Sequence, residues 1–229
     1  MRVDDIFCDA QSIASQFREF IEEPAFPCVG AKSALARGSL KIVSARDIRS
    51  AWNDIEIHDE LLEWTRAYRE EPGGLRSLAV VFAEPARLSE SEFESCMWER
   101  LQSLADKDVW REQPYDRRVS PNPDDPHFAL SFGGEAYFAV GLHPGAARPA
   151  RRFAYPAIVF NLHDQFERLR EEGRYERMRE RIIERDVKLA GSPNPMLVRH
   201  GEASAAAQYS GRIVPGEWRC PFADPRDSA

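Results

Sequence analysis

The chain has 229 residues, and its 38 acidic and 31 basic side chains give a formal charge of −7, with 43% hydrophobic and 30% charged residues. Domains usually hold ~100–200 residues, so this length allows one large domain or two small ones and excludes a disulfide-stapled miniprotein. The longest uncharged apolar stretches are far shorter than the ~20 residues of a membrane-spanning helix, and the negative charge argues against a nucleic-acid-binding protein.

Helical spacing of apolar residues, Val-rich runs and Pro or Gly breaks divide the first part of the chain into five elements. We expect helices at residues 10–22 and 57–70 and strands at residues 40–43 and 78–82, the second of which is buried. A semi-buried apolar turn is expected at residues 26–33. Ser89, with Glu92 three residues later, has the pattern of a capping box and predicts the start of another helix.

The second part of the chain begins after an irregular connection at residues 113–126. Its residue pattern predicts mainly strands and one long helical region. We expect three strands, at residues 127–132, 135–142 and 157–161. The helical region is expected at residues 162–189, and a proline-rich extended tail beyond residue 191. Gly133-Gly134 joins the first two strands and is a two-residue hairpin signal. Gly173 predicts a break or a close-packing point within the helical region.

These elements predict an α+β fold, in the broad sense a mixed α/β fold. Alternation of strands and helices is too irregular for a doubly wound sheet. We therefore expect a single domain over residues 1–229, with a small sheet that contains an antiparallel hairpin, helices packed against the sheet, and an extended C-terminal tail.

Common catalytic and metal-binding fingerprints are missing from the sequence. There is no GxGxxG before a helix, no GxxxxGK[ST], no HExxH and no GxSxG. The cysteines form no CxxC pair and are expected to be free thiols; they are Cys8, Cys28, Cys96 and Cys220. The acidic first residues lack the basic segment of a signal peptide, so we expect a cytoplasmic location.

Two histidines stand at the ends of predicted strands, where binding sites are often built. His143 precedes Pro144, so its side chain is expected to project from the rim of the sheet, or to cap a strand carbonyl. His163 borders the apolar stripe of Phe166 and Leu169 on a helical wheel, where it can meet a ligand or bond a neighbouring carbonyl. The other histidines are more typical of surface or turn positions; they are His58, His127 and His200.

Arginines gather between these two histidines. Arg148, Arg151 and Arg152 carry planar guanidinium groups that suit carboxylates or phosphates, which predicts an anion site such as one for a macrocycle with two propionates. The alternative is a loop held by salt bridges to the charged helix that follows. Cys28 and Cys220 adjoin prolines among aromatic residues, where a cysteine can present a thiolate to iron or simply act as a small buried side chain.

Several segments, in the same order, resemble the YqcI/YcgG family over about residues 26–222. The segments are FPCVGAKSAL at 26–35, GLHP at 141–144, ARRF at 150–153, VFNLHDQFERLR at 159–170, RD at 185–186, GSPNPML at 191–197, QYSGR at 208–212 and WRCPF at 218–222. The loop at 144–148 departs from the family, because alanines stand where serines are common.

This resemblance implies a haem-dependent monooxygenase. Such an enzyme uses haem b, O₂ and external electrons to N-hydroxylate the guanidino group of L-arginine or of a related guanidino compound. The absence of a flavin or nicotinamide fingerprint implies that a ferredoxin, a flavodoxin or a reductase supplies the electrons. A homodimer is compatible with this reading.

The resemblance also gives roles to the candidate residues. His163 is the first candidate for the iron ligand and His143 the second, with Cys28 and Cys220 as further alternatives. Arg148, Arg151 and Arg152 are expected to hold the haem propionates. The acids in family-like segments are candidates to bind the substrate cation, and they are Glu135, Asp164 and Glu202.

Two other classes of protein remain open from the sequence alone. A non-catalytic haem-binding protein, acting in haem storage, sensing or stress response, would carry the same ligands as the enzyme. A haem-free structural or interaction protein would have its histidines simply packed in the fold.

Overall fold

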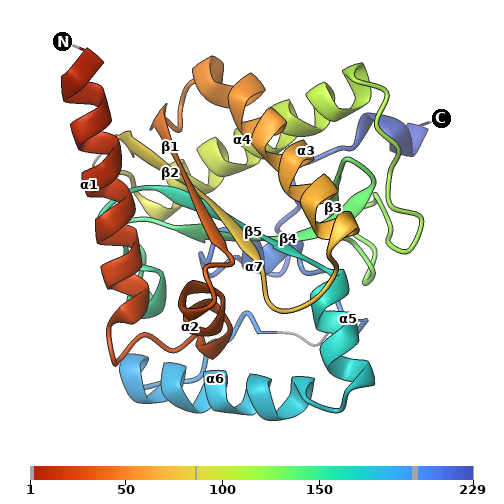
Figure 1. Ribbon diagram of the computed structural model, residues 1–229. Coiled ribbons are helices and arrows are strands. Elements are labelled where there is room, and N and C mark those ends of the chain that lie inside the picture. The colour runs from red at the N-terminus through yellow and green to blue at the C-terminus, as the bar shows by residue number, and fades with distance from the viewer. Residues whose placement is uncertain (1–2, 86, 198–200, 229) are drawn as a thin grey trace.

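A five-stranded mixed sheet runs through the middle of the molecule (Figure 1). The computed structural model describes residues 3–85, 87–197 and 201–228, with side chains from residue 11 to residue 227 within these ranges. The strand order is β1-β2-β5-β4-β3, in which β1 is parallel to β2 and the other neighbours are antiparallel. The strands are β1 Leu40–Asp47, β2 Ser77–Glu84, β3 Leu130–Phe132, β4 Glu135–Leu142 and β5 Ala157–Leu162.

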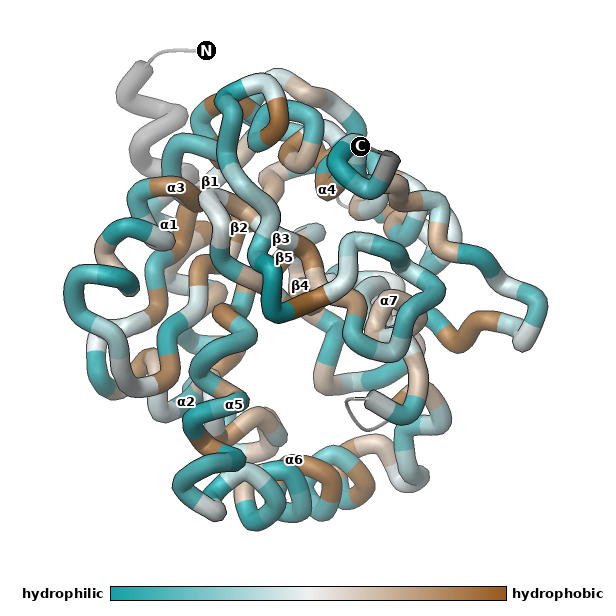
Figure 2. Tube along the Cα trace, turned by 90° about the vertical axis from the view of Figure 1, so that its right-hand side faces the viewer, coloured by the Kyte–Doolittle hydropathy of each residue, from teal (hydrophilic) through white to brown (hydrophobic). Residues whose placement is uncertain are grey.

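Helices cover both faces of this sheet and one end of the molecule. In the described part of the chain they are α1 Val3–Glu22, α2 Val29–Ala36, α3 Asp54–Glu70, α4 Glu90–Trp110, α5 Asp164–Glu171, α6 Tyr175–Ala190 and α7 Ala206–Tyr209. Figures 1 and 2 show α6 lying along one end, below the strands. The predicted single α+β domain with an antiparallel hairpin is confirmed as a fold class.

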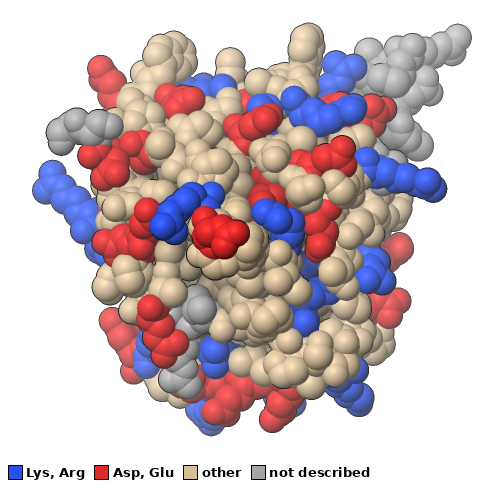
Figure 3. All heavy atoms as spheres, turned by 180° about the vertical axis from the view of Figure 1, so that it is seen from behind, with Lys and Arg blue, Asp and Glu red and all other residues tan. Residues whose placement is uncertain are grey.

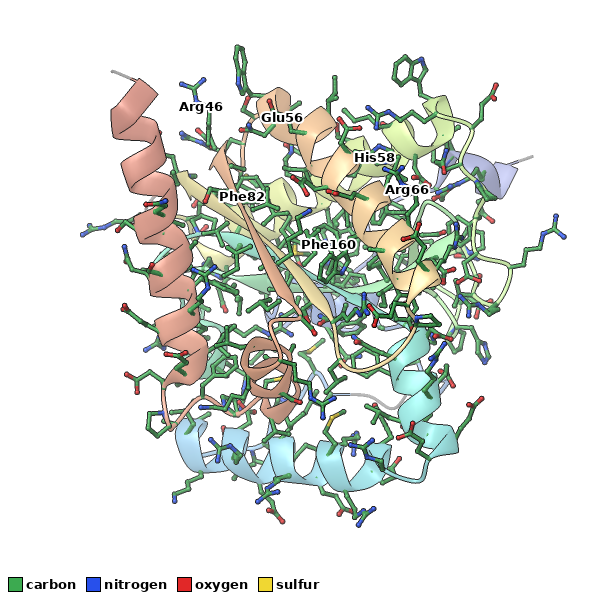
Figure 4. The ribbon with its side chains drawn as sticks, viewed as in Figure 1. Arg46, Glu56, His58, Arg66, Phe82 and Phe160 are labelled. Atoms are coloured by element: carbon green, nitrogen blue, oxygen red, sulfur yellow. The ribbon has the colours of Figure 1, made fainter. Side chains whose placement is uncertain are left out.

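Alternation along the strands divides the buried side chains between two hydrophobic cores. Phe82 on β2 and Phe160 on β5 belong to the core against α3 and α4, the α3/α4 core, and Figure 4 shows both near the centre. Val81 on β2 belongs to the core against α1, the α1 core, with Phe17 and Leu142. The sheet therefore separates the α3/α4 core from the α1 core, and a side chain at a strand end packs on the side of one core or of the other.

Most predicted elements are present, with longer bounds. The expected helix at 10–22 begins at Val3, and the expected strands at 40–43 and 78–82 extend to residues 47 and 84. Ser89 and Glu92 form the predicted capping box at the start of α4. Gly133 and Gly134, with φ of 59° and 78°, form the predicted hairpin turn, whose left-handed backbone suits glycine.

Three segments differ from the prediction. The segment 26–33 contains the start of α2 rather than a turn alone, because the Cys28 side chain caps the helix by accepting the Ala31 N–H. The strand expected at 127–132 is limited to Leu130–Phe132. The tail beyond 191 includes α7.

Charged side chains of both signs are interspersed over the rear face of the molecule (Figure 3). Among the described helices, none has the length and apolar character needed to cross a membrane.

Strand β4 lies close to α4 at Gly141. A Cβ atom there would lie 2.6 Å from Phe93 Cε1 and 2.9 Å from Met97 Sδ, inside the α3/α4 core. We expect Gly141→Ala to lower the free energy of unfolding by about 1–3 kcal/mol, because an overpacked core must shift. Urea unfolding measures this change. Gly216→Ala is the control, since its Cβ would meet no atom within 4 Å; equal stability of the two variants would contradict the close approach.

Candidate ligand cavity

Two adjoining cavities lie between α6 and the sheet face that carries Val140 and Val159. The first, of about 270 Å³, is the Arg151 cavity, and its walls include Cys28, Arg148, Arg151, Asn161, Gln165 and Asp186. The second, of about 250 Å³, is the His163 cavity, and its walls include Phe128, Phe138, His163, Arg170, Tyr175 and Arg179. They share five wall residues, Phe166, Met178, Ile182, Ile183 and Leu197. Together the cavities reach the ~300–1,000 Å³ typical of small-molecule sites.

His163 lies where β5 passes into α5. Its backbone N–H donates to the Ala136 carbonyl at 2.8 Å, and its own carbonyl accepts from the N–H of Phe166. Its side chain, 15% exposed, lines the His163 cavity, and its Nδ1 is 3.7 Å from Glu167 Oε1. The prediction that this imidazole borders an apolar surface is confirmed. An imidazole at the wall of an apolar cavity can serve as an iron ligand or as a hydrogen-bonding group.

Two arginines that the sequence analysis did not single out, Arg170 and Arg179, line the His163 cavity. The Arg170 guanidinium lies 4.3 Å from the Tyr175 ring centroid and pairs with Glu167. Arg179 lines the same cavity from α6. The available signal was spacing, because Arg170 follows His163 by seven residues and residues seven apart share a helix face.

His143 does not lie at an open rim, so that prediction is wrong. Its side chain is 1% exposed and stacks on Phe93 of α4, with ring centroids 4.3 Å apart. Its Nδ1 has no hydrogen-bond partner among the described residues, and burial lowers its pKa to about 4. His143 lines neither cavity, so the fold does not bring it together with His163.

The remaining histidines were expected at surface or turn positions, and the structure places one of them in the interior instead. His58 is fully buried rather than at the surface, and its Nε2 lies 2.8 Å from Asp108 Oδ1. Figure 4 shows His58 on α3, away from α6. His127 is exposed, as expected for a turn position. His200 lies outside the described residues.

The three loop arginines have separate roles in the fold. Arg148 pairs with Asp186 of α6 and also donates to the Ser192 carbonyl at 2.9 Å. Among the described residues, the partners of Arg151 are backbone carbonyls. Arg152 donates to the carbonyls of its own loop and lines neither cavity. The salt-bridge alternative therefore describes Arg148, whereas Arg151 remains a cation at a cavity wall.

Both candidate cysteines are protonated thiols. Cys28 lines the Arg151 cavity, and burial raises its pKa despite the neighbouring backbone N–H groups and Arg151. Cys220 packs against the α3/α4 core, lines neither cavity, and has a pKa raised to about 12 by burial. Cys28, Cys96 and Cys220 are free. Iron ligation by sulfur requires the thiolate, which burial disfavours at both candidate positions.

In the described structure none of the three predicted acids lines the Arg151 cavity or the His163 cavity. Glu135 and Asp164 both pair with Arg118, at 2.6 and 3.2 Å, in a charged cluster beyond the cavity walls. Glu202 is exposed. The acid at the cavity is Asp186, 8% exposed, which sequence reasoning missed. Its signal was the four-residue spacing from Met178 and Ile182, which places it on the apolar side of α6.

In its described residues the chain is an α+β protein with two adjoining, mainly apolar cavities, whose walls include His163, Asp186 and several arginines. The family comparison extends over most of this structure. The model of the YqcI/YcgG family matches residues 17–223, and the chain belongs to that family. Searches of curated proteins and of solved structures give no match.

Proposed function

We propose that the protein is a haem-dependent monooxygenase that N-hydroxylates the guanidino group of L-arginine or a related guanidino compound. The observation that carries this proposal is the partly exposed imidazole of His163 at the wall of an apolar cavity, with a second cavity beside it. The family resemblance supplies the type of reaction, and the cavity supplies residues suited to it.

The side chains of the His163 cavity fit haem b. His163 would ligate the iron, Phe138 and Phe166 would contact the macrocycle, and Arg170 and Arg179 would pair with the propionates. Haem iron requires only one protein ligand and therefore no cluster of ligating side chains. In the described part of the chain no group of three or more such side chains is found. Bound haem supplies the iron centre at which O₂ is activated.

The Arg151 cavity is the candidate site for the guanidino substrate, because it adjoins the His163 cavity and shares five wall residues with it. Apolar wall residues such as Phe166 and Met178 would exclude water from the reacting nitrogen. The net reaction converts an N–H bond into N–OH with one atom of O₂. The other oxygen atom leaves as water, which takes two electrons and two protons from an external donor such as a reduced ferredoxin, a flavodoxin or a reductase.

Haem reconstitution followed by turnover tests this proposal. The reconstituted protein is expected to show a Soret band that shifts on adding L-arginine. With O₂ and a reductant, mass spectrometry is expected to detect a gain of one oxygen atom on a guanidino nitrogen. A panel of guanidines measured in the same two ways defines the substrate.

The possible outcomes separate the classes of function. Absence of a Soret band would exclude haem binding and leave a structural or interaction protein. Binding shifts without product, with a reductant known to reduce the iron, would favour a non-catalytic haem-binding protein. Oxygen on a carbon atom would retain the monooxygenase and refute N-hydroxylation.

A further inference from the structure

The walls of the Arg151 cavity carry a net positive charge. Three wall residues are charged in the described structure, Arg148, Arg151 and Asp186. Arg148 and Asp186 form a buried ion pair and neutralise each other. Among the described residues no carboxylate is in direct contact with Arg151, so this cation is not neutralised. Since a buried cation without a counter-ion is unfavourable, this cavity favours an anionic group beside Arg151.

The partners of Arg151 hold its guanidinium in place without neutralising it. Its Nη1 donates to the carbonyls of Gly141 at 3.1 Å and Tyr209 at 2.9 Å, and its Nη2 donates to the Gln208 carbonyl at 2.9 Å. A guanidinium has five N–H donors, so these three bonds leave Nε–H and one Nη2–H without a partner among the described residues. Burial lowers the Arg151 pKa to about 10, so the group stays charged at neutral pH.

Neighbouring polar groups also favour an anion. The Cys28 thiol is kept protonated by burial and supplies no negative charge. Gln165, 3% exposed, accepts the backbone N–H of Arg76 at 2.7 Å through its side-chain oxygen. This bond fixes the orientation of the Gln165 side-chain amide. The other polar group of the amide is its NH₂ group, which is a hydrogen-bond donor. Gln165 and Arg151 are thus two wall residues of this cavity that carry hydrogen-bond donors.

We propose that Arg151 binds the carboxylate group of a ligand in the Arg151 cavity. Resting on the proposed function, this assigns the substrate to the guanidino acids, such as L-arginine, rather than to alkylguanidines without a carboxylate. A carboxylate has a second source, because the His163 cavity shares five wall residues and a haem propionate would carry the same group. The test must therefore distinguish the substrate carboxylate from the propionate.

Matched ligands test the carboxylate without requiring turnover. Isothermal titration calorimetry of the purified protein compares L-arginine and 4-guanidinobutyrate, which carry a carboxylate, with agmatine, which lacks one. Charge-assisted hydrogen bonds predict affinities roughly 10- to 100-fold higher for the two acids. Equal affinities of the wild-type protein for 4-guanidinobutyrate and agmatine would overturn the substrate assignment.

Variants locate the effect at Arg151. Arg151→Gln is expected to lower the ratio of affinities for L-arginine and agmatine to near one. Arg46→Gln is the control, because Arg46 is exposed on β1 at the far end from α6, as Figure 4 shows. Circular dichroism checks the fold of each variant. If Arg151→Gln does not fold, Arg151→Lys is measured instead, since lysine keeps the positive charge but lacks the paired N–H donors of the guanidinium. The preference for the two acids is then expected to weaken without disappearing.

Haem titration, followed by the Soret band, separates the two sources of the carboxylate. A lost preference for L-arginine with unchanged haem affinity assigns Arg151 to the substrate. An unchanged preference with roughly tenfold weaker haem binding assigns Arg151 to a propionate and overturns the substrate class. No change in either measurement would refute a carboxylate site. Because calorimetry records binding alone, a failure of N-hydroxylation does not decide this test.

Discussion

Replacement of His163 by alanine is expected to abolish stable haem incorporation. A neutral imidazole is a strong iron ligand, and without it the cavity retains only apolar contacts and the arginines of its wall. After reconstitution with haem and gel filtration, the wild-type protein should retain a Soret band and His163→Ala should not.

Two further variants serve as controls for this result. His127→Ala removes an exposed histidine, 64% exposed at its side chain, and should retain haem as the wild type does. His143→Ala tests the second candidate from the sequence, whose buried ring lines neither cavity. An unchanged ferric spectrum in His163→Ala would contradict His163 as the ligand and return the assignment to His143 or a cysteine.

Acid is expected to destabilise the protein through His143. Burial beside Phe93 lowers the His143 pKa to about 4, below the ~6.5 of an unfolded histidine, so the folded state favours the neutral ring. This contribution to stability is complete above pH ~6.5 and is lost as the pH falls towards 4. The expected loss is on the order of 2 kcal/mol.

Urea unfolding at several pH values between 7 and 4 measures this effect. Carboxylates also titrate in this range, so the quantity to compare is the difference between the wild type and His143→Gln, which does not titrate. The dependence of the unfolding free energy on pH should be shallower in the variant. Parallel curves would contradict a buried neutral histidine.

Strands and turns with simple local signals could be predicted from the sequence. Glu135–Leu142 has the predicted bounds because a two-glycine turn fixes where the strand begins and Pro144 follows its end. Segments that depend on distant contacts could not be predicted as well. Residues 127–129 were predicted to be part of a strand but lie outside β3. Phe128 packs instead against Tyr209 and Phe222 of the C-terminal tail. Helix α2 was missed because cysteine is an unusual N-cap.

The candidate site shows the same division. His163 was found because a strand end and an apolar stripe are both local patterns. The different environment of His143 depends on α4, some 50 residues earlier in the chain, packing against its ring, which no local pattern reveals. Arg179 and Asp186 lie within a helix rich in charged residues, and only the position of α6 across the cavities distinguishes them from their solvated neighbours.

Because the two cavities share part of their wall, ligands bound in both would be thermodynamically linked. Met178, Ile182 and Ile183 of α6 contribute to both enclosures, so a ligand that repositions these side chains in one cavity changes the shape of the other. Linkage is reciprocal: whatever factor one occupant adds to the affinity of the second, the second adds to the affinity of the first. Ile183, which lines both cavities, is thus placed to affect this coupling.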